Sequence, residues 1–181
     1  YTHSKDRYYR RLLIFAAISQ IPFNLALGAF GLNIMFTLLI CFAIIWVMEN
    51  VSGSTRRNLF AAGLTVLSVI SDWGIFAAIF TIIFERRRGN KDKYQTLLSF
   101  CYCTLVFGFF EYLNLAGNFG YIAAISHVIF EMLPLVAAGL MIEFFYNGRK
   151  SDRNQIFNKW FFYVYYPVHL LVLYLIKTMI K

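Results

Sequence analysis

Long apolar runs divide this chain, and they constrain its fold more than any other feature. They cover residues 12–29, 33–48, 58–84, 96–110, 121–146 and 160–178. Asn-Gly hairpins and alternating strands of about ten residues do not separate them, so helices are favoured over a β-barrel. Hydrophobic residues make up 60% of the chain, against about 45–50% in soluble domains even with glycine counted. The sequence therefore predicts an all-α, polytopic integral-membrane helical bundle.

Basic residues gather in the polar segments between these runs. Lysine and arginine are concentrated at residues 5–11, 54–58, 85–93 and 148–159. The connections at 28–33 and 111–120 contain neither. The positive-inside rule favours the cytoplasm for every basic segment, including the opening residues 1–11, which we expect to be a polar loop. The net charge of +8 then reflects topology and contacts with membrane lipids, and no nucleic-acid partner is expected.

The run at 58–84 is too long for one ordinary membrane helix. It would extend about 40 Å, whereas the hydrocarbon core is about 30 Å thick. "SDWG" at 71–74 interrupts it, with Asp72 beside Gly74. We expect two short helices that meet at Asp72 and either just cross or dip in and return, which gives about seven membrane segments in total. Asp72 is then a functional candidate at a helix break, or it caps a helix starting at Trp73 from an external turn.

A histidine and a glutamate, His127 and Glu131, lie four residues apart in the run at 121–146. This spacing places them on one face of a helix, within reach of each other. They are either a general base with its orienting carboxylate or a neutralised structural pair. Two helical ligands without a third indicate no metal site, and no metal is expected.

The last run, 160–178, carries His169 among tyrosines. Tyr163, Tyr166 and His169 recur every three residues, loosely on one side of a helix and next to Pro167. An ionisable group inside a membrane segment usually faces the bundle interior or a polar cavity. His169 therefore either belongs to a polar site or is a structural histidine bonded to a neighbouring hydroxyl or carbonyl.

The loop before this run, "YNGRKSDR" at 146–153, ends the preceding helix at Asn147 and Gly148. Three cations follow in the loop: Arg149, Lys150 and Arg153. At the predicted cytoplasmic mouth, they would be the first side chains to meet an anionic ligand from the cytosol.

"FFYNGRKSDR" followed by "KWFFYVYYPVHLLVLYLI" resembles the end of the TraX family, whose members carry a YNG-plus-basic loop and then a Phe-Tyr-x-x-Tyr-Pro-x-His-Leu helix. The opening "YTHSKDRYYRRLLIFAAISQIPFNLAL" is similar to the family's segment after its second transmembrane helix, and "SDWG" to its Asp-aromatic-Gly break. The resemblance covers nearly the whole chain and makes Pro167 and His169 motif positions. Ser151 departs from the glycine that is frequent there in the family.

The resemblance also implies two upstream helices, the first with an Asp-His-Ile-Gly motif that is the leading candidate for the catalytic histidine. Residues 1–181 are accordingly expected to form a single integral-membrane acyltransferase-like domain that lacks those two helices. TraX proteins are named for acetylating the amino terminus of conjugative pilin, and they are similar to membrane acyltransferases that use acetyl-coenzyme A.

The function implied is that of a multi-pass acetyltransferase of the bacterial inner membrane. It would transfer an acetyl group from acetyl-coenzyme A to an amine, such as the pilin N-terminus, or to a hydroxyl acceptor, such as a glycan. The alternative, from another class, is a non-enzymatic transporter or channel with an ion or small-molecule site at the broken helix around Asp72.

For the acetyltransferase, the candidate site residues fall into groups with different roles. The catalytic candidates are His169, Asp72, His127 and Glu131. The cations for the phosphates of acetyl-coenzyme A are Arg10, Arg11, Arg149, Lys150 and Arg153. Tyr166 and Asn147 are the candidates for contact with the acceptor. We expect the ring of His169 to face an intramembrane cavity, shared with Asp72 or with the His127–Glu131 pair, and to hold donor or acceptor through a hydrogen bond.

Overall fold

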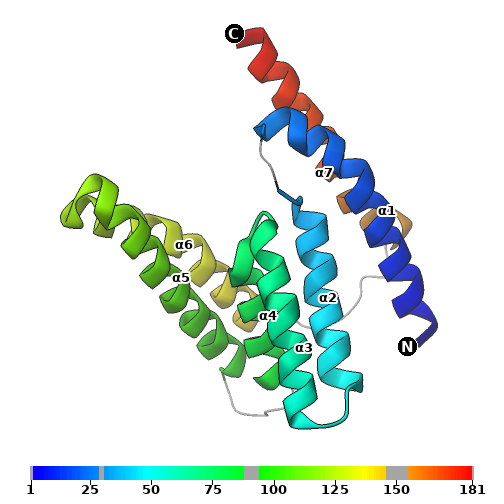
Figure 1. The fold of residues 1–181 in the computed structure, drawn as a ribbon. Helices are drawn as coiled ribbons and strands as arrows, with labels where there is room; N and C mark the ends of the chain where they lie inside the picture. The colour runs from blue at the N-terminus through cyan, green and yellow to red at the C-terminus, as the bar shows by residue number, and fades with distance from the viewer. Residues whose placement is uncertain (1, 29–30, 88–93, 146–154, 181) are drawn as a thin grey trace. The chain divides into compact units, whose positions relative to one another are not determined.

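The computed structural model describes residues 2–28, 31–87, 94–145 and 155–180, and in these residues it is built from helices (Figure 1). The helices are α1 (Thr2–Leu27), α2 (Ile34–Asn50), α3 (Ser54–Leu67), α4 (Gly74–Arg87), α5 (Gln95–Phe119), α6 (Tyr121–Phe145) and α7 (Gln155–Ile180). A short 3-10 turn, η1 (Ser68–Ile70), lies between α3 and α4. The prediction of an all-helical chain is confirmed for the described residues.

Two predicted connections are wrong. The opening residues, expected to be a polar loop, are helical from Thr2, and α1 continues to Leu27. Residues 111–119, expected to connect two helices, belong to α5, which ends before Gly120 at a φ of 82°. Both errors have one cause, because polarity alone does not end a helix: lysine and arginine in residues 5–11, and glutamate, leucine and alanine in residues 111–119, are good helix formers. The helix α5 ends instead at the positive φ of Gly120.

The helices form two compact units, which are described separately. The first unit contains α1, α2, α3, η1, the first part of α4 and α7, and the second contains the end of α4, α5 and α6.

In the first unit, α1 packs against both α2 and α7 (Figure 1). Leu12 near the start of α1 lies in one buried cluster with Tyr163 near the start of α7. Towards the other ends of the two helices, the Lys177 Nζ atom donates a hydrogen bond of 2.9 Å to the carbonyl oxygen of Ala26. The two helices most distant in the sequence therefore lie side by side and run parallel.

In the second unit, α5 and α6 pack as an antiparallel hairpin. Small residues allow this close approach. A Cβ atom on Gly139 of α6 would lie 2.7 Å from the Cβ atom of Phe100 on α5, and one on Gly108 would collide with Met132. Phe84 at the end of α4 adds an edge-to-face contact with Phe100, with ring centroids 5.0 Å apart.

Three helices of the described residues are long and apolar enough to cross a membrane: Gln95–Gly117 in α5, Tyr121–Phe145 as α6 and Trp160–Ile180 in α7. This is fewer than the predicted number of membrane segments. With 14 residues each, α3 and α4 are about 21 Å long, short of the roughly 30 Å core. Polar residues lower the hydropathy of α1, and the apolar helix α2 has 17 residues.

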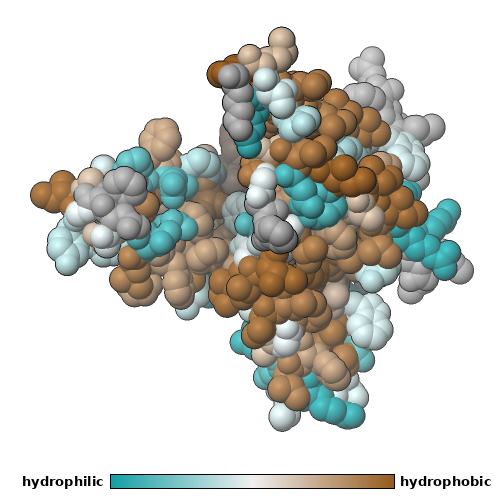
Figure 2. Space-filling view, turned by 45° about the horizontal axis from the view of Figure 1, so that its top comes forward, coloured by the Kyte–Doolittle hydropathy of each residue, from teal (hydrophilic) through white to brown (hydrophobic). Residues whose placement is uncertain are grey.

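Hydrophobic residues cover much of the face in Figure 2. On α6, Ile122 is 87% exposed and Phe130 is 76% exposed. Apolar surface of this extent is what lipid contact requires, and it is uncommon on soluble monomers. Together with the three apolar helices, it indicates a membrane protein.

Candidate functional site

The break at Asp72 lies beside the connection that leads into α2. The Leu32 N–H donates to the Ile70 carbonyl oxygen at 2.9 Å, and the Asp72 N–H donates to the Leu32 carbonyl oxygen at 2.8 Å. The two non-helical segments thus form an isolated parallel bridge at Leu32 and Ser71. The predicted interruption of the run at 58–84 is confirmed, although α4 begins at Gly74, one residue later than expected. The bridge fixes the backbone of Asp72 next to the start of α2.

Asn33 holds this connection against α1. Its side chain is fully buried, and its Oδ1 atom caps α2 by accepting a hydrogen bond of 2.9 Å from the Met35 N–H. Its Nδ2 atom donates to the Ala16 carbonyl oxygen at 2.8 Å and to Gln20 Oε1 at 3.0 Å. Gln20 in turn donates to the Gly31 carbonyl oxygen at 2.7 Å. A single buried amide therefore links the first helix, the connection and the start of the second helix.

Tyr166 of α7 also contacts the start of α2. Its hydroxyl oxygen accepts a hydrogen bond from the backbone N–H of Ile34, the first residue of α2. The Asp72 carboxylate is close enough to this hydroxyl to interact with it electrostatically, and its own side chain is exposed. The N-terminus of a helix favours negative charge. Two predicted site residues, Asp72 and Tyr166, are thus brought together at the start of α2.

His169 lies one turn after Tyr166 on α7. The centroid of its ring is 5.4 Å from that of Tyr166, and it stacks on Tyr165 with centroids 5.3 Å apart and an interplanar angle of 12°. The side chain is half-buried, and its Nδ1 atom is buried without a hydrogen-bond partner among the described residues. Tyr166 therefore has the His169 ring as a neighbour on its own helix and the Asp72 carboxylate within electrostatic range. The predicted orientation of His169 towards a shared cavity stays a prediction.

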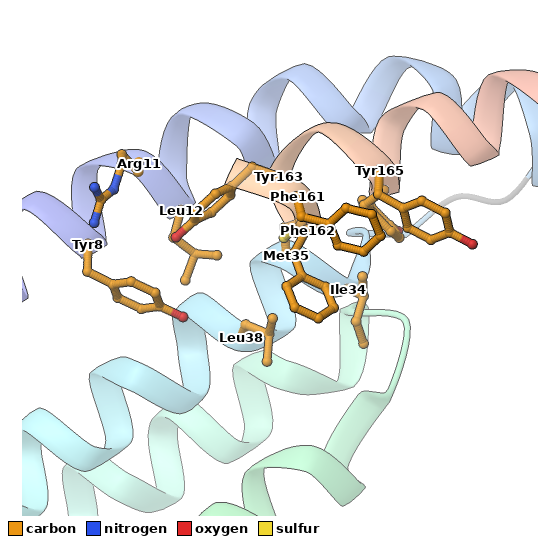
Figure 3. Close-up of a pocket in the computed structure, with 11 residues that line it drawn as sticks. Tyr8, Arg11, Leu12, Ile34, Met35, Leu38, Phe161, Phe162, Tyr163 and Tyr165 are labelled. Atoms are coloured by element: carbon orange, nitrogen blue, oxygen red, sulfur yellow. The ribbon is translucent and has the colours of Figure 1, made fainter. Parts of the chain in front are cut away.

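A pocket of about 560 Å³ lies between α1, α2 and α7 (Figure 3). Its volume falls within the range of ligand pockets, roughly 300–1,000 Å³. Tyr166 is part of the lining, and Arg11 supplies the one charged side chain among the described lining residues; His169 and Asp72 do not line it. Sequence analysis missed this pocket, because its walls come from helices far apart in the chain. The signal available was the concentration of phenylalanine and tyrosine at 161–166.

Tyr8 lies beside Arg11 at one end of the pocket in Figure 3, and its side chain is 39% exposed. Partial burial raises the pKa of its hydroxyl above the ordinary value for tyrosine, and the Arg11 guanidinium opposes this with a smaller effect. The hydroxyl is therefore protonated at neutral pH and can donate a hydrogen bond into the pocket.

The remaining predicted site residues are described separately. Arg10 is exposed on α1. His127 and Glu131 are exposed one turn apart on α6, in the second unit. The predicted loop residues lie outside the described residues: Asn147, Arg149, Lys150 and Arg153. In the described part of the chain, no group of three or more His, Cys, Asp or Glu side chains is arranged to hold a metal ion.

A family model described as "TraX protein" matches residues 1–177. The chain belongs to the TraX family. A curated relative from Dichelobacter nodosus, named "Probable fimbrial assembly protein FimC, serogroup H1", is 25% identical over 190 residues, which cover 94% of this chain and 72% of that protein. No solved structure matches the chain significantly. The resemblance inferred from the terminal Tyr-Pro-x-His-Leu motif is thereby confirmed, and the TraX match includes Asp72, Tyr166 and His169.

Proposed function

We propose that this TraX-family protein is a multi-pass acetyltransferase of the bacterial inner membrane, and that it transfers an acetyl group from acetyl-coenzyme A to the amino terminus of a pilin. The observation that carries the proposal is the meeting of Asp72, Tyr166 and His169 near the start of α2. It places a carboxylate, a hydroxyl and an imidazole on neighbouring segments of a membrane protein. The named role of the D. nodosus relative in fimbrial assembly supports a pilin-related acceptor.

The roles of these residues follow from the chemistry of acyl transfer. The acceptor nitrogen attacks the thioester carbonyl, a C–N bond forms, the C–S bond breaks, and coenzyme A leaves as the thiol after taking up the proton lost by the amine. The Asp72 carboxylate is suited to accept that proton first. The Tyr166 hydroxyl accepts a hydrogen bond from the Ile34 N–H, which makes it a better donor to the developing oxyanion. His169 is suited to hold donor or acceptor through its ring nitrogens.

The donor requires cations for its phosphates, because charge-assisted hydrogen bonds to phosphate are strong. The exposed Arg10 fits this role on α1, and the loop at 146–153 supplies further cations in the sequence. Because α1 and α7 pack in parallel, the basic residues near the start of α1 lie at the same end as the start of α7, which the basic residues 149–153 precede in the sequence. By the positive-inside rule that end faces the cytoplasm, where acetyl-coenzyme A is made.

The first test measures transfer of radiolabelled acetyl groups by the full-length protein in liposomes, with a peptide that carries a free pilin-type amino terminus. We expect label in the peptide and release of free thiol, and no label in a peptide with a blocked amino terminus. Tyr166→Phe should lower the transfer rate about 10²-fold or more, as loss of an oxyanion donor does.

Tyr165→Phe is the matched control, because the Tyr165 ring, like that of Tyr166, is a neighbour of His169, but the Tyr165 side chain is exposed. It should leave the rate nearly unchanged. His169→Ala should lower transfer far more than it lowers expression or stability in detergent. A protein that neither binds nor consumes acetyl-coenzyme A is not an acetyltransferase. The broken helix at Asp72 would then favour the alternative of a transporter or channel with a site at the break.

A further inference from the structure

The pocket between α1, α2 and α7 has the chemistry of an amphiphile site. Aromatic and aliphatic side chains form most of its walls, and among the lining residues that the structure describes Arg11 is the one that carries a charge. No carboxylate is found among these described lining residues. An amine or a cationic headgroup would therefore find no counter-charge there, and a peptide backbone would find few partners for its N–H and C=O groups. An elongated apolar chain with one negative end fits both parts of the pocket.

The surroundings of Arg11 favour the binding of an anion. Its side chain is half-buried, and its Nε atom is buried without a hydrogen-bond partner among the described residues. The Tyr163 hydroxyl lies in hydrogen-bonding contact with the guanidinium, and the protonated Tyr8 hydroxyl lies nearby. A partly buried cation beside neutral hydroxyls is stabilised by an incoming negative group. A phosphate would receive charge-assisted hydrogen bonds from the guanidinium and a further one from Tyr8.

The depth of the pocket matches the position of a lipid phosphate. The apolar span of α7 is Trp160–Ile180. The residues that α7 contributes to the wall lie in the first two turns of this span: Phe161, Phe162, Tyr163, Tyr165 and Tyr166. Tryptophan and tyrosine at such a position are typical of the membrane interface. Phe162 is 68% exposed, so the wall is open to surrounding acyl chains. Arg10, exposed one residue before Arg11, adds positive charge at the same end of α1.

We propose that this pocket binds one anionic glycerophospholipid, with an acyl chain against the aromatic wall and the phosphate on Arg11. Lipid binding requires no acetyl-coenzyme A and no acceptor, so it can be tested independently of the proposed transfer reaction. The site would make the protein sensitive to the anionic lipid content of its membrane.

Trp160 provides the measurement, because its ring lies 6.3 Å from that of Tyr163 at the edge of the pocket. The full-length protein, with its other tryptophans replaced by phenylalanine, is placed in nanodiscs of unlabelled phosphatidylcholine. Phosphatidylglycerol or phosphatidylcholine with brominated acyl chains is then added at equal mole fractions. Bromine quenches tryptophan at short range. We expect stronger quenching of Trp160 by brominated phosphatidylglycerol than by brominated phosphatidylcholine.

Two charge variants distinguish binding at Arg11 from general electrostatic attraction of anionic lipid to the surface of α1. Arg11→Gln should make the two lipids quench equally, whereas Arg10→Gln, which removes the same charge from an exposed neighbour, should preserve the difference. Leu38→Phe narrows the pocket from α2 at a side chain that is 45% exposed. It should reduce quenching by both brominated lipids while circular dichroism remains unchanged.

Four results would overturn the proposal. Equal quenching by both lipids in the parent protein would exclude a preference for the anionic one. Equal loss of the preference in Arg10→Gln and Arg11→Gln would indicate attraction to the surface of α1 alone. Loss of the preference in soluble glycerol phosphate, combined with unchanged quenching in Leu38→Phe, would indicate a headgroup or free-phosphate site without an acyl-chain pocket. If Arg11→Gln does not fold, undiminished quenching in a folded Leu38→Phe variant has the same consequence.

Discussion

At the scale of single residues, Asn33 shows how much one side chain can organise. Its amide caps α2, bonds to the Ala16 carbonyl and meets Gln20. The sequence places it at the end of a short connection, where asparagine is common for local reasons. Nothing in that pattern indicates partners on α1, which lie 13 and 17 residues away.

We expect Asn33→Ala to destabilise the protein by about 1–3 kcal/mol, because buried hydrogen-bond partners are left unsatisfied and a helix cap is lost. The measurement is thermal unfolding in detergent. Asn50→Ala is the matched control: its amide donates to the Trp46 carbonyl oxygen at the exposed end of the same helix, at 2.8 Å. That change should stay within about 0.5 kcal/mol. Equal losses in the two variants would contradict the role assigned to Asn33.

At the scale of elements, the sequence predicts features that depend on neighbouring residues, and it does not predict contacts between helices that are far apart in the chain. The break at 71–74 is visible because a glycine and an aspartate interrupt an overlong apolar run. The neighbourhood of Tyr166 and His169 follows from helical spacing. The bond from the Ile34 N–H to Tyr166 could not be predicted, since no periodicity indicates which helix packs on α7. The pocket was missed for the same reason.

Helix packing in the second unit gives an element-scale prediction. Gly139→Ala should destabilise the α5–α6 hairpin by about 1–3 kcal/mol, because the added Cβ atom would meet the rigid Cβ atom of Phe100 at 2.7 Å. Gly117→Ala is the contrasting change within α5, since no atom lies within 4 Å of its added Cβ. It should stabilise the helix by about 0.5–1 kcal/mol. Thermal unfolding of both variants in the same detergent compares them, and similar shifts in one direction would exclude close packing at Gly139.

At the scale of the whole molecule, the parallel course of α1 and α7 supports the predicted topology. If both helices leave the cytoplasm, the chain between them must cross back an odd number of times. A single crossing by residues 58–84 would break that count, whereas two short passes or a re-entrant hairpin preserves it. The lengths of α3 and α4, 14 residues each, fit a shallow hairpin better than two full crossings.

Cysteine labelling with an impermeant reagent tests this topology after Cys41, Cys101 and Cys103 are replaced. We expect Arg56→Cys and Lys91→Cys to react from the cytoplasmic side; Lys91 lies outside the described residues. The controls sit at the far ends of the parallel helices, where Leu27→Cys and Ile180→Cys should react from the opposite side. Labelling of Arg56→Cys and Lys91→Cys from different sides would mean that residues 58–84 cross the membrane once.

The pairing of α1 with α7 also has a consequence for biogenesis. Domains tend to fold as the chain emerges, from the amino-terminal end onwards, yet α1 here packs along the helix that is translated after all the others described. Until α7 is inserted, the surface of Phe23 and Ala26 lacks the cover that Leu170 provides. The second unit is complete earlier, because α5 and α6 are neighbours in the chain. A ribosome that stalls before α7 therefore leaves a finished hairpin attached to an open first unit, which is a recognisable target for membrane quality control.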